Sequence, residues 1–256
     1  MIDSRAIIDP SAKLADDVQV GPWSVIGPDV EIGPGTVISS HVVIQGPTKI
    51  GAHNRIFQFA SVGEECQDKK YAGEPTRLEI GDHNVIREGV TIHRGTVQDN
   101  GETIIGSHNL FMAYSHVAHD CVVGDHVIMA NNASIAGHVH VGDWVILGGF
   151  TAVHQFCQVG AHAMTGAASL VLKDVPAYVM ANGNSAEPHG INVEGLKRRG
   201  FSKTAIQVLR RAYKAVYREG LTVGQALERL RELAKHAPEV DLMIASLERS
   251  NRGIIR

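Results

Sequence analysis

The chain has 256 residues, 44% of them hydrophobic and 20% charged, with a formal net charge of −3 at pH 7. These values are typical of a globular protein and exclude the global basic field that binds nucleic acid. The first residues mix acids, bases and a proline, and no apolar run of 18 residues occurs. We therefore expect no signal peptide, no transmembrane segment and a cytoplasmic location. The three cysteines lack CxxC spacing, which favours reduced thiols over disulfides or a zinc ribbon.

An apolar residue recurs at every sixth position from the start of the chain. The first members of this register are Ile2, Ile8, Leu14, Val20, Ile26, Ile32, Ile38, Ile44, Ile50, Ile56 and Val62. The spacing returns at Ile80 and, after a slip of one residue, runs from Ile105 to Val171 with Thr165 as its only polar member. Glycine often follows the apolar residue directly, and a small or β-branched residue often precedes it by two positions.

A period of six fits neither a helix nor a simple sheet. It fits a prism of short strands joined by tight corners, in which glycine would tolerate the φ values that a corner imposes. Each strand would pair with the strand one coil above, because a single coil cannot bury its own apolar edge. The unit resembles that of the hexapeptide-repeat acyltransferases. This resemblance implies a left-handed parallel β-helix with three strands per coil, so that three units of six residues make a coil of 18.

Two polar segments interrupt the repeat, residues 64–79 and 94–104, and we expect both to loop out of the prism. The repeat ends after Val171, and a connector rich in Pro, Gly and Asn follows. We therefore predict a β-helix over residues 1–190 and a small α-helical domain over residues 191–256. Ser202, the pair Thr222 and Gln225, and Pro238 provide the helix-start signals.

Residues 18 apart should stand directly above one another. Five histidines, mostly in G-x-H turns, are then expected to be corner residues: His53, His83, His108, His126 and His162. His119 differs, because we expect it on a flat, with Gly137 one coil above and Gln155 two coils above. An imidazole beside an open backbone N–H could combine a base with an oxyanion donor.

Two further features of the columns bear on ligand binding. No column supplies three metal ligands, so no metal site is predicted. The column Ala113, Asn131, Gly149 and Ala167 contains only small residues or amides and predicts a shallow channel. Such a channel would receive either an acyl chain or a neighbouring subunit.

Six motifs make the resemblance more specific, namely SHVAHDC, AGHV, AVHQF, QDKKYAGEPTR, TIHRGTVQ and NVEGLKRRGF. They are similar to those of the hexapeptide acyltransferases that begin lipid A biosynthesis, and the similarity covers the whole chain. It implies transfer of a 3-hydroxyacyl chain from acyl carrier protein to the 3-hydroxyl of UDP-N-acetylglucosamine. It also implies a homotrimer with active sites between subunits, and no cofactor beyond the phosphopantetheine of the donor.

The resemblance also implies residue roles. His119 would be the general base, Asp120 would support its imidazole, and Gly137 N–H would stabilise the oxyanion. Ala167 would end the acyl groove and act as a ruler for chain length, so we expect a medium-to-long donor. The implied substrate-binding residues are Asp68, Lys70, His116, His138, Gln155, Asn192, Glu194, Arg198 and Arg199.

Other functions remain open from the sequence alone. The later N-acyltransferase of the same pathway shares the fold, but carries a uridine-binding domain ahead of its repeat, whereas this repeat starts at Ile2. A coenzyme A-dependent acetyltransferase would use another donor, and a carbonic-anhydrase-like protein would need three histidines on zinc. A non-catalytic scaffold is a fourth alternative. Rossmann and P-loop nucleotide sites are not supported, because no GxGxxG or P-loop motif occurs.

Overall fold

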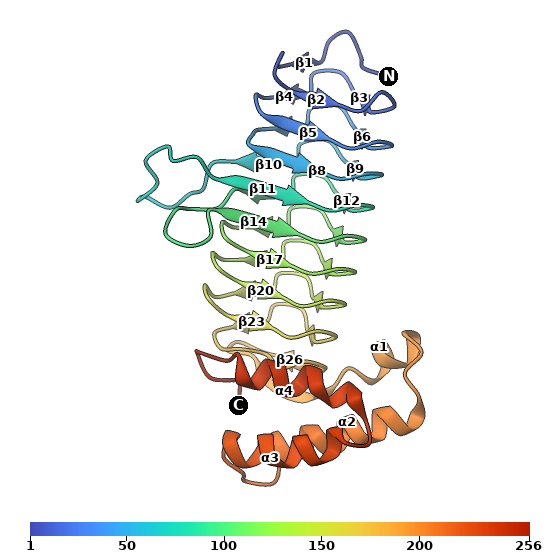
Figure 1. Cartoon of the computed structure of the whole chain (residues 1–256), viewed down its shortest axis with the longest axis vertical. Coiled ribbons are helices and arrows are strands. Elements are labelled where there is room, and N and C mark those ends of the chain that lie inside the picture. The colour runs from blue at the N-terminus through green and yellow to red at the C-terminus, as the bar shows by residue number, and fades with distance from the viewer.

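The computed structural model describes residues 1–256 as a three-sided column of short strands with helices packed at its C-terminal end (Figure 1). Strands β1 to β25 enter three sheets in turn, and each pairs in parallel with its neighbours in the coils before and after it. No helix has the length and apolar character needed to cross a membrane.

We number the sheets in the order in which the chain enters them. Sheet 1 contains β1 (Ile7–Ile8), β4 (Val25–Ile26), β7 (Val43–Ile44), β10 (Ser61–Glu64), β13 (Thr91–His93), β16 (His116–Val117), β19 (Ser134–Ile135), β22 (Ala152–Val153) and β25 (Leu170–Val171). Sheet 2 contains β2 (Lys13–Leu14), β5 (Val30–Ile32), β8 (Thr48–Ile50), β11 (Arg77–Ile80), β14 (Glu102–Ile105), β17 (Val122–Val123), β20 (His140–Val141) and β23 (Gln158–Val159). Sheet 3 contains β3 (Gln19–Val20), β6 (Val37–Ile38), β9 (Arg55–Ile56), β12 (Val85–Ile86), β15 (Leu110–Phe111), β18 (Ile128–Met129), β21 (Ile146–Leu147), β24 (Met164–Thr165), β26 (Val179–Asn182) and β27 (Glu187–Ile191).

The predicted 18-residue register is confirmed. Leu110 pairs with Ile128 and Ile128 with Ile146, each one coil higher. The apolar register fills the interior of the prism, and its buried residues join those of the C-terminal helices in one continuous core of 59 residues. Ile2 is an exception at 49% exposed, because it lies at the end of the stack. Burial between stacked coils therefore supplies the main stabilisation of the column.

The corners are built differently from our expectation. The left-handed φ falls on the third residue after the apolar one, and this residue is rarely glycine: His53, His83, His108, His126 and His162 have φ between 56° and 62°. The five histidines are therefore corner residues, as predicted. Apart from Gly63, the glycines that follow the apolar residue have no such φ and are required by crowding instead. A Cβ on Gly33 would lie only 2.7 Å from the carbonyl carbon of Gly51 in the next coil.

Both interruptions leave the prism at the corner between sheets 1 and 2, and their loops lie side by side in Figure 1. The segments without strand are 65–76 and 94–101, shorter than the expected 64–79 and 94–104. The difference arises because β11 and β14 begin earlier than the polar sequence suggests. Leu78 and Thr103 point inward in these strands and are fully buried.

The C-terminal part begins where β27 pairs antiparallel with β26 and leads into the helices. The helices are α1 (Val193–Arg198), α2 (Lys203–Tyr217), α3 (Val223–Ala234), the 3-10 turn η1 (Pro238–Val240) and α4 (Asp241–Glu248). The predicted start signals are confirmed, since Ser202 caps α2 and Thr222 forms a capping box with Gln225 at α3. Tyr178 ties the helices to the prism by donating to the carbonyl of Glu239 over 2.6 Å.

The crowding of the glycines yields a stability prediction. Gly33→Ala should lower the free energy of unfolding by about 1–3 kcal/mol, because the added methyl meets rigid backbone. Gly224→Ala is the matched control, since no atom lies within 4 Å of the added Cβ on α3. It should be neutral or stabilise the protein by up to about 1 kcal/mol. Denaturant unfolding followed by circular dichroism measures both, and equal effects would contradict the crowding argument.

Candidate active site

The candidate active site lies at the corner where the chain passes from sheet 1 to sheet 2. Five successive coils contribute to it: the loops 65–76 and 94–101, then the turns at 119–120, 137–138 and 155–156. The turns stack directly, because His138 N–H donates to the His119 carbonyl over 3.0 Å and Phe156 N–H donates to the Gly137 carbonyl over 3.1 Å. The predicted column of His119, Gly137 and Gln155 therefore exists, and both loops stand beside it.

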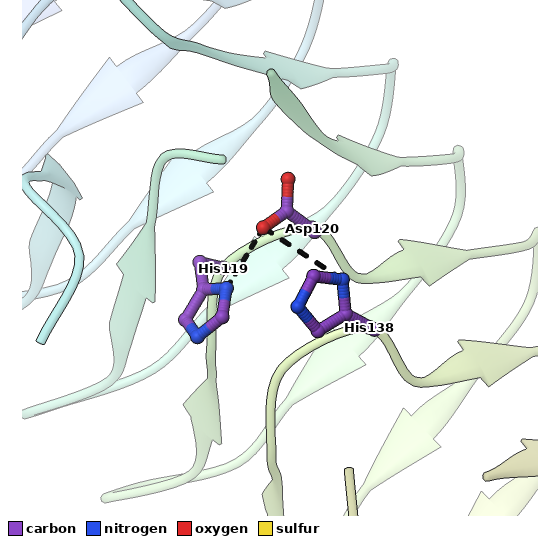
Figure 2. A group of neighbouring side chains, drawn as sticks. All are labelled: His119, Asp120 and His138. Carbon is purple, nitrogen blue, oxygen red and sulfur yellow. Dashed lines mark hydrogen bonds and ion pairs between the residues drawn. The ribbon is translucent and has the colours of Figure 1, made fainter. Parts of the chain in front are cut away.

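His119 and Asp120 form a hydrogen-bonded pair (Figure 2). Nδ1 of His119 lies 2.8 Å from Oδ2 of Asp120. Because a carboxylate only accepts, the neutral imidazole carries its proton on Nδ1 and leaves Nε2 free as a base. The prediction that His119 lies on a flat is wrong: it lies in the turn after β16, since Asp120 occupies the left-handed corner position with φ 56°.

The Asp120 carboxylate is buried, and both of its oxygens accept hydrogen bonds. Its Oδ1 accepts from Thr96 N–H over 2.8 Å, and its Oδ2 accepts from the Thr96 hydroxyl over 2.6 Å. Burial opposes ionisation, but the hydrogen bonds from His119 and Thr96 outweigh it and lower the pKa of Asp120. Asp120 is therefore a carboxylate at neutral pH and stabilises a positive charge on His119.

His138 stands one coil above Asp120 and faces two carboxylates. Its Nδ1 lies 2.8 Å from Oδ2 of Asp99 and 3.9 Å from Oδ2 of Asp120. Its ring stacks on Phe156 with centroids 4.3 Å apart and meets the edge of His119 at 5.0 Å. These contacts fix the orientation of the imidazole at the rim of the site.

His116 lies on β16 beside the pair and is held by the coil below it. Its Nδ1 is 2.7 Å from the Thr91 hydroxyl, and its ring packs edge-to-face with His93 at 5.1 Å. Burial, together with the neighbouring His93 and His119, lowers the pKa of His116 to about 4. Burial also lowers the pKa of His93. His116 is therefore neutral at physiological pH and offers a hydrogen bond without a charge.

A hollow of about 530 Å³ opens beside these residues on the outer face of sheet 1. His116, His119, Gly137 and Gln155 line it, with Asp68 from the first loop. Gly137 N–H donates no hydrogen bond within the chain, so it is available to a ligand. A Cβ on Gly137 would lie 2.5 Å from Cε1 of His119, so only glycine lets the imidazole approach this backbone.

His119, Asp120 and His138 also form a group whose ligand atoms lie within 4.8 Å of one another. Stacking of residues 18 apart does not reveal this group, because His119 and Asp120 are adjacent in sequence. A divalent transition metal would accept two imidazoles and a carboxylate as ligands. The donors are already used, however, since Asp120 bonds His119 and Thr96 while Asp99 bonds His138. The arrangement therefore fits a hydrogen-bonded relay better than a metal site.

The first loop brings only one of its two predicted residues into the hollow. Asp68 lines the hollow, and its Oδ1 accepts from the backbone N–H of Lys70 over 2.9 Å. The Lys70 side chain is exposed, lies outside the lining and has no partner. Its charge is thus not neutralised by another residue of the chain.

Asn192 and Arg199 lie at a different corner, where the chain passes from sheet 2 to sheet 3. Asn192 is buried and caps α1 by accepting from Gly195 N–H over 3.1 Å. The Arg199 guanidinium lies 5.2 Å from the Trp144 ring centroid and donates to the Trp144 carbonyl over 2.8 Å. Burial lowers the pKa of Arg199. Both residues therefore have structural contacts in the isolated chain.

Glu194 and Arg198 are exposed on the same short helix. Glu194 pairs with Lys197 over 2.7 Å, whereas Arg198 has no ion-pair partner. None of the predicted tail residues lines the hollow beside His119. One chain therefore does not bring the predicted nucleotide-binding segment to the catalytic pair.

Ala167 is exposed in the turn after β24, at the third corner, between sheets 3 and 1. Its column continues through Gly149, Asn131 and Ala113, as predicted, and exposed aromatic rings of Tyr114 and Phe150 flank it. Sheet 1 spans the distance between this column and the catalytic corner. The outward residues of β19 and β22 on that sheet, Ser134 and Ala152, are small and line the hollow.

Sequence reasoning missed four residues of the site: Thr91, His93, Thr96 and Asp99. Thr91 pairs with His116, which is 25 positions later and not 18, because the second loop lengthens that coil. Counting the loop into the period would have found Thr91 and His93. Thr96 and Asp99 lie in the loop itself, where no periodicity assigns a position.

Comparisons with known proteins show which family the chain belongs to. Two segments, residues 11–46 and 102–137, match the bacterial transferase hexapeptide model, and residues 174–255 match the second-domain model of UDP-N-acetylglucosamine O-acyltransferase. The hexapeptide solenoid and these two matches place the chain in the class of hexapeptide-repeat acyltransferases.

The relatives narrow this class. The acyl-(acyl-carrier-protein)–UDP-N-acetylglucosamine O-acyltransferase of Stutzerimonas stutzeri is 65% identical over 256 residues, which cover 100% of this chain and 99% of that protein. The solved structure of LpxA from Acinetobacter baumannii is 60% identical with a TM-score of 0.98, covering 100% of this chain and 99% of that chain. A UDP-N-acetylglucosamine acyltransferase from Francisella novicida is 44% identical with a TM-score of 0.98, covering 100% and 94%. The chain therefore belongs to the UDP-N-acetylglucosamine O-acyltransferase family, and its left-handed parallel β-helix is confirmed.

The low pKa of His116 yields a pH prediction. The folded protein should bind a proton at His116 only near pH 4, whereas the unfolded chain binds it near 6.5. The free energy of unfolding should therefore fall as the pH drops from about 6.5 to about 4, and His116→Gln should reduce this fall. Histidine-labelled NMR titration checks the pKa directly. A His116 resonance that titrates near 6.5 would contradict the assignment.

Proposed function

We propose that this chain transfers a 3-hydroxyacyl group from acyl carrier protein to the 3-hydroxyl of UDP-N-acetylglucosamine, the first step of lipid A biosynthesis. The observation that carries the proposal is the His119–Asp120 pair facing the free N–H of Gly137 in one open hollow. The names of the relatives supply the substrate classes. A location in the cytoplasm stays a prediction.

In the proposed reaction, Nε2 of His119 takes the proton of the sugar 3-hydroxyl as its oxygen attacks the thioester carbonyl. Asp120 stabilises the imidazolium that forms, because it accepts from Nδ1 over 2.8 Å. Gly137 N–H donates to the oxyanion of the tetrahedral intermediate. Collapse of the intermediate breaks the carbon–sulfur bond, and the imidazolium returns its proton to the thiolate. The products are the O-acylated sugar nucleotide and the free phosphopantetheine thiol of the carrier.

The remaining residues of the hollow would bind the sugar. His116 and Gln155 line the hollow, His138 stands beside His119, and their hydrogen-bonding groups suit the hydroxyls and the acetamido group of the acceptor. Asp68 and Lys70 from the first loop would close over it. No step in this scheme needs a metal or a cofactor of the enzyme, since the donor carries its own phosphopantetheine.

We further propose a homotrimer in which each active site lies between two subunits. The support is the separation within one chain: Asn192, Glu194, Arg198 and Arg199 lie at the corner between sheets 2 and 3, away from the hollow on sheet 1. A guanidinium fork suits a pyrophosphate, so Arg198 of a neighbour would complete the nucleotide site. Three such sites would close around the threefold axis.

The acyl chain would cross the outer face of sheet 1 from His119 towards Ala167. The support is the run of small residues, Ser134 and Ala152, and the exposed column that ends at Ala167. In this proposal the Ala167 methyl shortens the groove slightly relative to glycine. A medium-to-long 3-hydroxyacyl donor would fill it.

A turnover assay with a series of 3-hydroxyacyl carrier proteins and UDP-N-acetylglucosamine, read by product mass, tests the function and His119 together. The wild type should form the O-acylated product. His119→Ala should lose roughly two to four orders of magnitude, as expected for a general base, whereas His236→Ala, at an exposed position after α3, should retain wild-type turnover. Transfer from acetyl coenzyme A or onto an amine would favour the other acyltransferases. Wild-type turnover by His119→Ala would remove the general base from the proposal.

Mixing two inactive variants tests the shared site. We expect His119→Ala and Arg198→Ala chains, each impaired alone, to regain part of the activity when they are unfolded and reassembled together. The reason is that some sites in the mixture combine an intact His119 with an intact Arg198 from the neighbour. Light scattering should show three chains per particle. A fully active monomer, or no recovery in trimers of confirmed mixed composition, argues against the shared site.

Ala167 should set the preferred acyl length. Ala167→Gly should shift the optimum to longer donors and Ala167→Met to shorter ones. Each methylene that fails to fit loses roughly 0.8 kcal/mol of burial, so donors two carbons apart should differ about tenfold or more. Competition between donors of different length gives the ratio of kcat/KM. If neither substitution moves the optimum, Ala167 does not end the groove.

A further inference from the structure

Thr96 makes an unusual contact with the site, because one residue binds both oxygens of the Asp120 carboxylate. Its N–H donates to Oδ1 over 2.8 Å and its hydroxyl donates to Oδ2 over 2.6 Å. Thr96 is 1% exposed and Asp120 is 2% exposed, so water does not compete for these bonds. Two donors from one residue fix the plane of the carboxylate as well as its position.

The position of Thr96 is itself fixed by the base of the second loop. The Arg94 guanidinium, two residues earlier, donates to the carbonyls of Gly46 over 2.7 Å and Gly63 over 2.8 Å. The Thr96 carbonyl accepts from Gly101 N–H over 3.0 Å and closes the loop. These bonds therefore fix the backbone that carries both donors of Thr96, its N–H and its hydroxyl.

We propose that Thr96 is a positioning residue of the reaction, which acts by orienting Asp120. Its two bonds direct Oδ2 at Nδ1 of His119, and this keeps the imidazole proton on Nδ1 and leaves Nε2 as the free base. Thr96 touches no reacting atom. This inference rests on the proposed roles of His119 and Asp120 and adds a third member, which the loop 94–101 contributes.

Thr96→Val tests the inference, because it keeps the shape and the backbone bond but removes the hydroxyl donor. We expect kcat to fall roughly 10- to 100-fold, because a small misorientation of a catalytic group is sufficient for such a loss. KM for both substrates should stay within about twofold, because Thr96 does not line the hollow. Thr96→Ser retains a hydroxyl and should recover most of kcat. The matched control is Thr103→Val on β14, where the hydroxyl is buried and has no partner; its kcat should not change.

Two further measurements separate orientation from a general structural role. In an Asp120→Ala background, adding Thr96→Val should lower kcat by less than about twofold, because Thr96 acts through Asp120. If the double variant instead shows the product of the two single-variant losses in kcat, the inference is overturned. Nitrogen NMR of labelled histidine should show the Nδ1–H tautomer of His119 in the wild type and a mixture in Thr96→Val. An unchanged tautomer would also overturn it.

The outcomes distinguish this inference from the function on which it rests. If the wild type turns over and His119→Ala does not, wild-type kcat in Thr96→Val overturns the role of Thr96 alone. If the wild type transfers no acyl group, the proposed function itself fails. If Thr96→Val does not fold, Thr96→Ala takes its place. Alanine also removes the hydroxyl donor, it adds no methyl group in its place, and the expected loss of kcat is the same.

Discussion

The hydrogen bonding of each coil to the next determines where every residue of the site lies. Because strands pair in parallel with a repeat of 18 residues, a side chain keeps its place at a corner from coil to coil. The corner between sheets 1 and 2 collects two loops, a His–Asp pair and an open glycine N–H in this way. The same ladder that buries the core therefore also aligns groups from five coils. A site on such a frame needs little reorganisation before reaction.

Crowding at the corners decides which residues the ladder tolerates. Glycine is required where the next coil approaches, and the neighbouring left-handed position carries larger side chains, including Asp120 and His138. At Gly137 this crowding has a chemical result, because the missing side chain admits the His119 ring. The proposed base, His119, and the proposed oxyanion donor, Gly137 N–H, therefore lie together because the packing of the two coils requires a glycine there. The supporting bonds from Thr96 and Asp99 come from outside the ladder.

From the sequence we predicted the positions that the six-residue period determines and missed the contacts made by residues in the loops. The resemblance to hexapeptide-repeat acyltransferases supplied the left hand and the three strands per coil, and the period then placed the register, the corner histidines and the stacking of His119 under Gly137. It misassigned the reason for the glycines, because sequence does not reveal how closely two backbones approach. Thr96 and Asp99 escaped detection because a loop has no register. Arg198 and Arg199 matched a family motif, but no contact in one chain joins them to the hollow.

The position of the hollow along the column affects how local opening reaches it. Solenoids lose their terminal repeats first, because an end coil has only one neighbour. The site draws on the coils between residues 65 and 156, with further coils on the N-terminal side and the helices on the C-terminal side. Fraying of the N-terminal coils would thus cost stability before it disturbed His119. Slow amide exchange would then be concentrated in the coils that form the candidate active site. The N-terminal coils would open first and delay unfolding of the site.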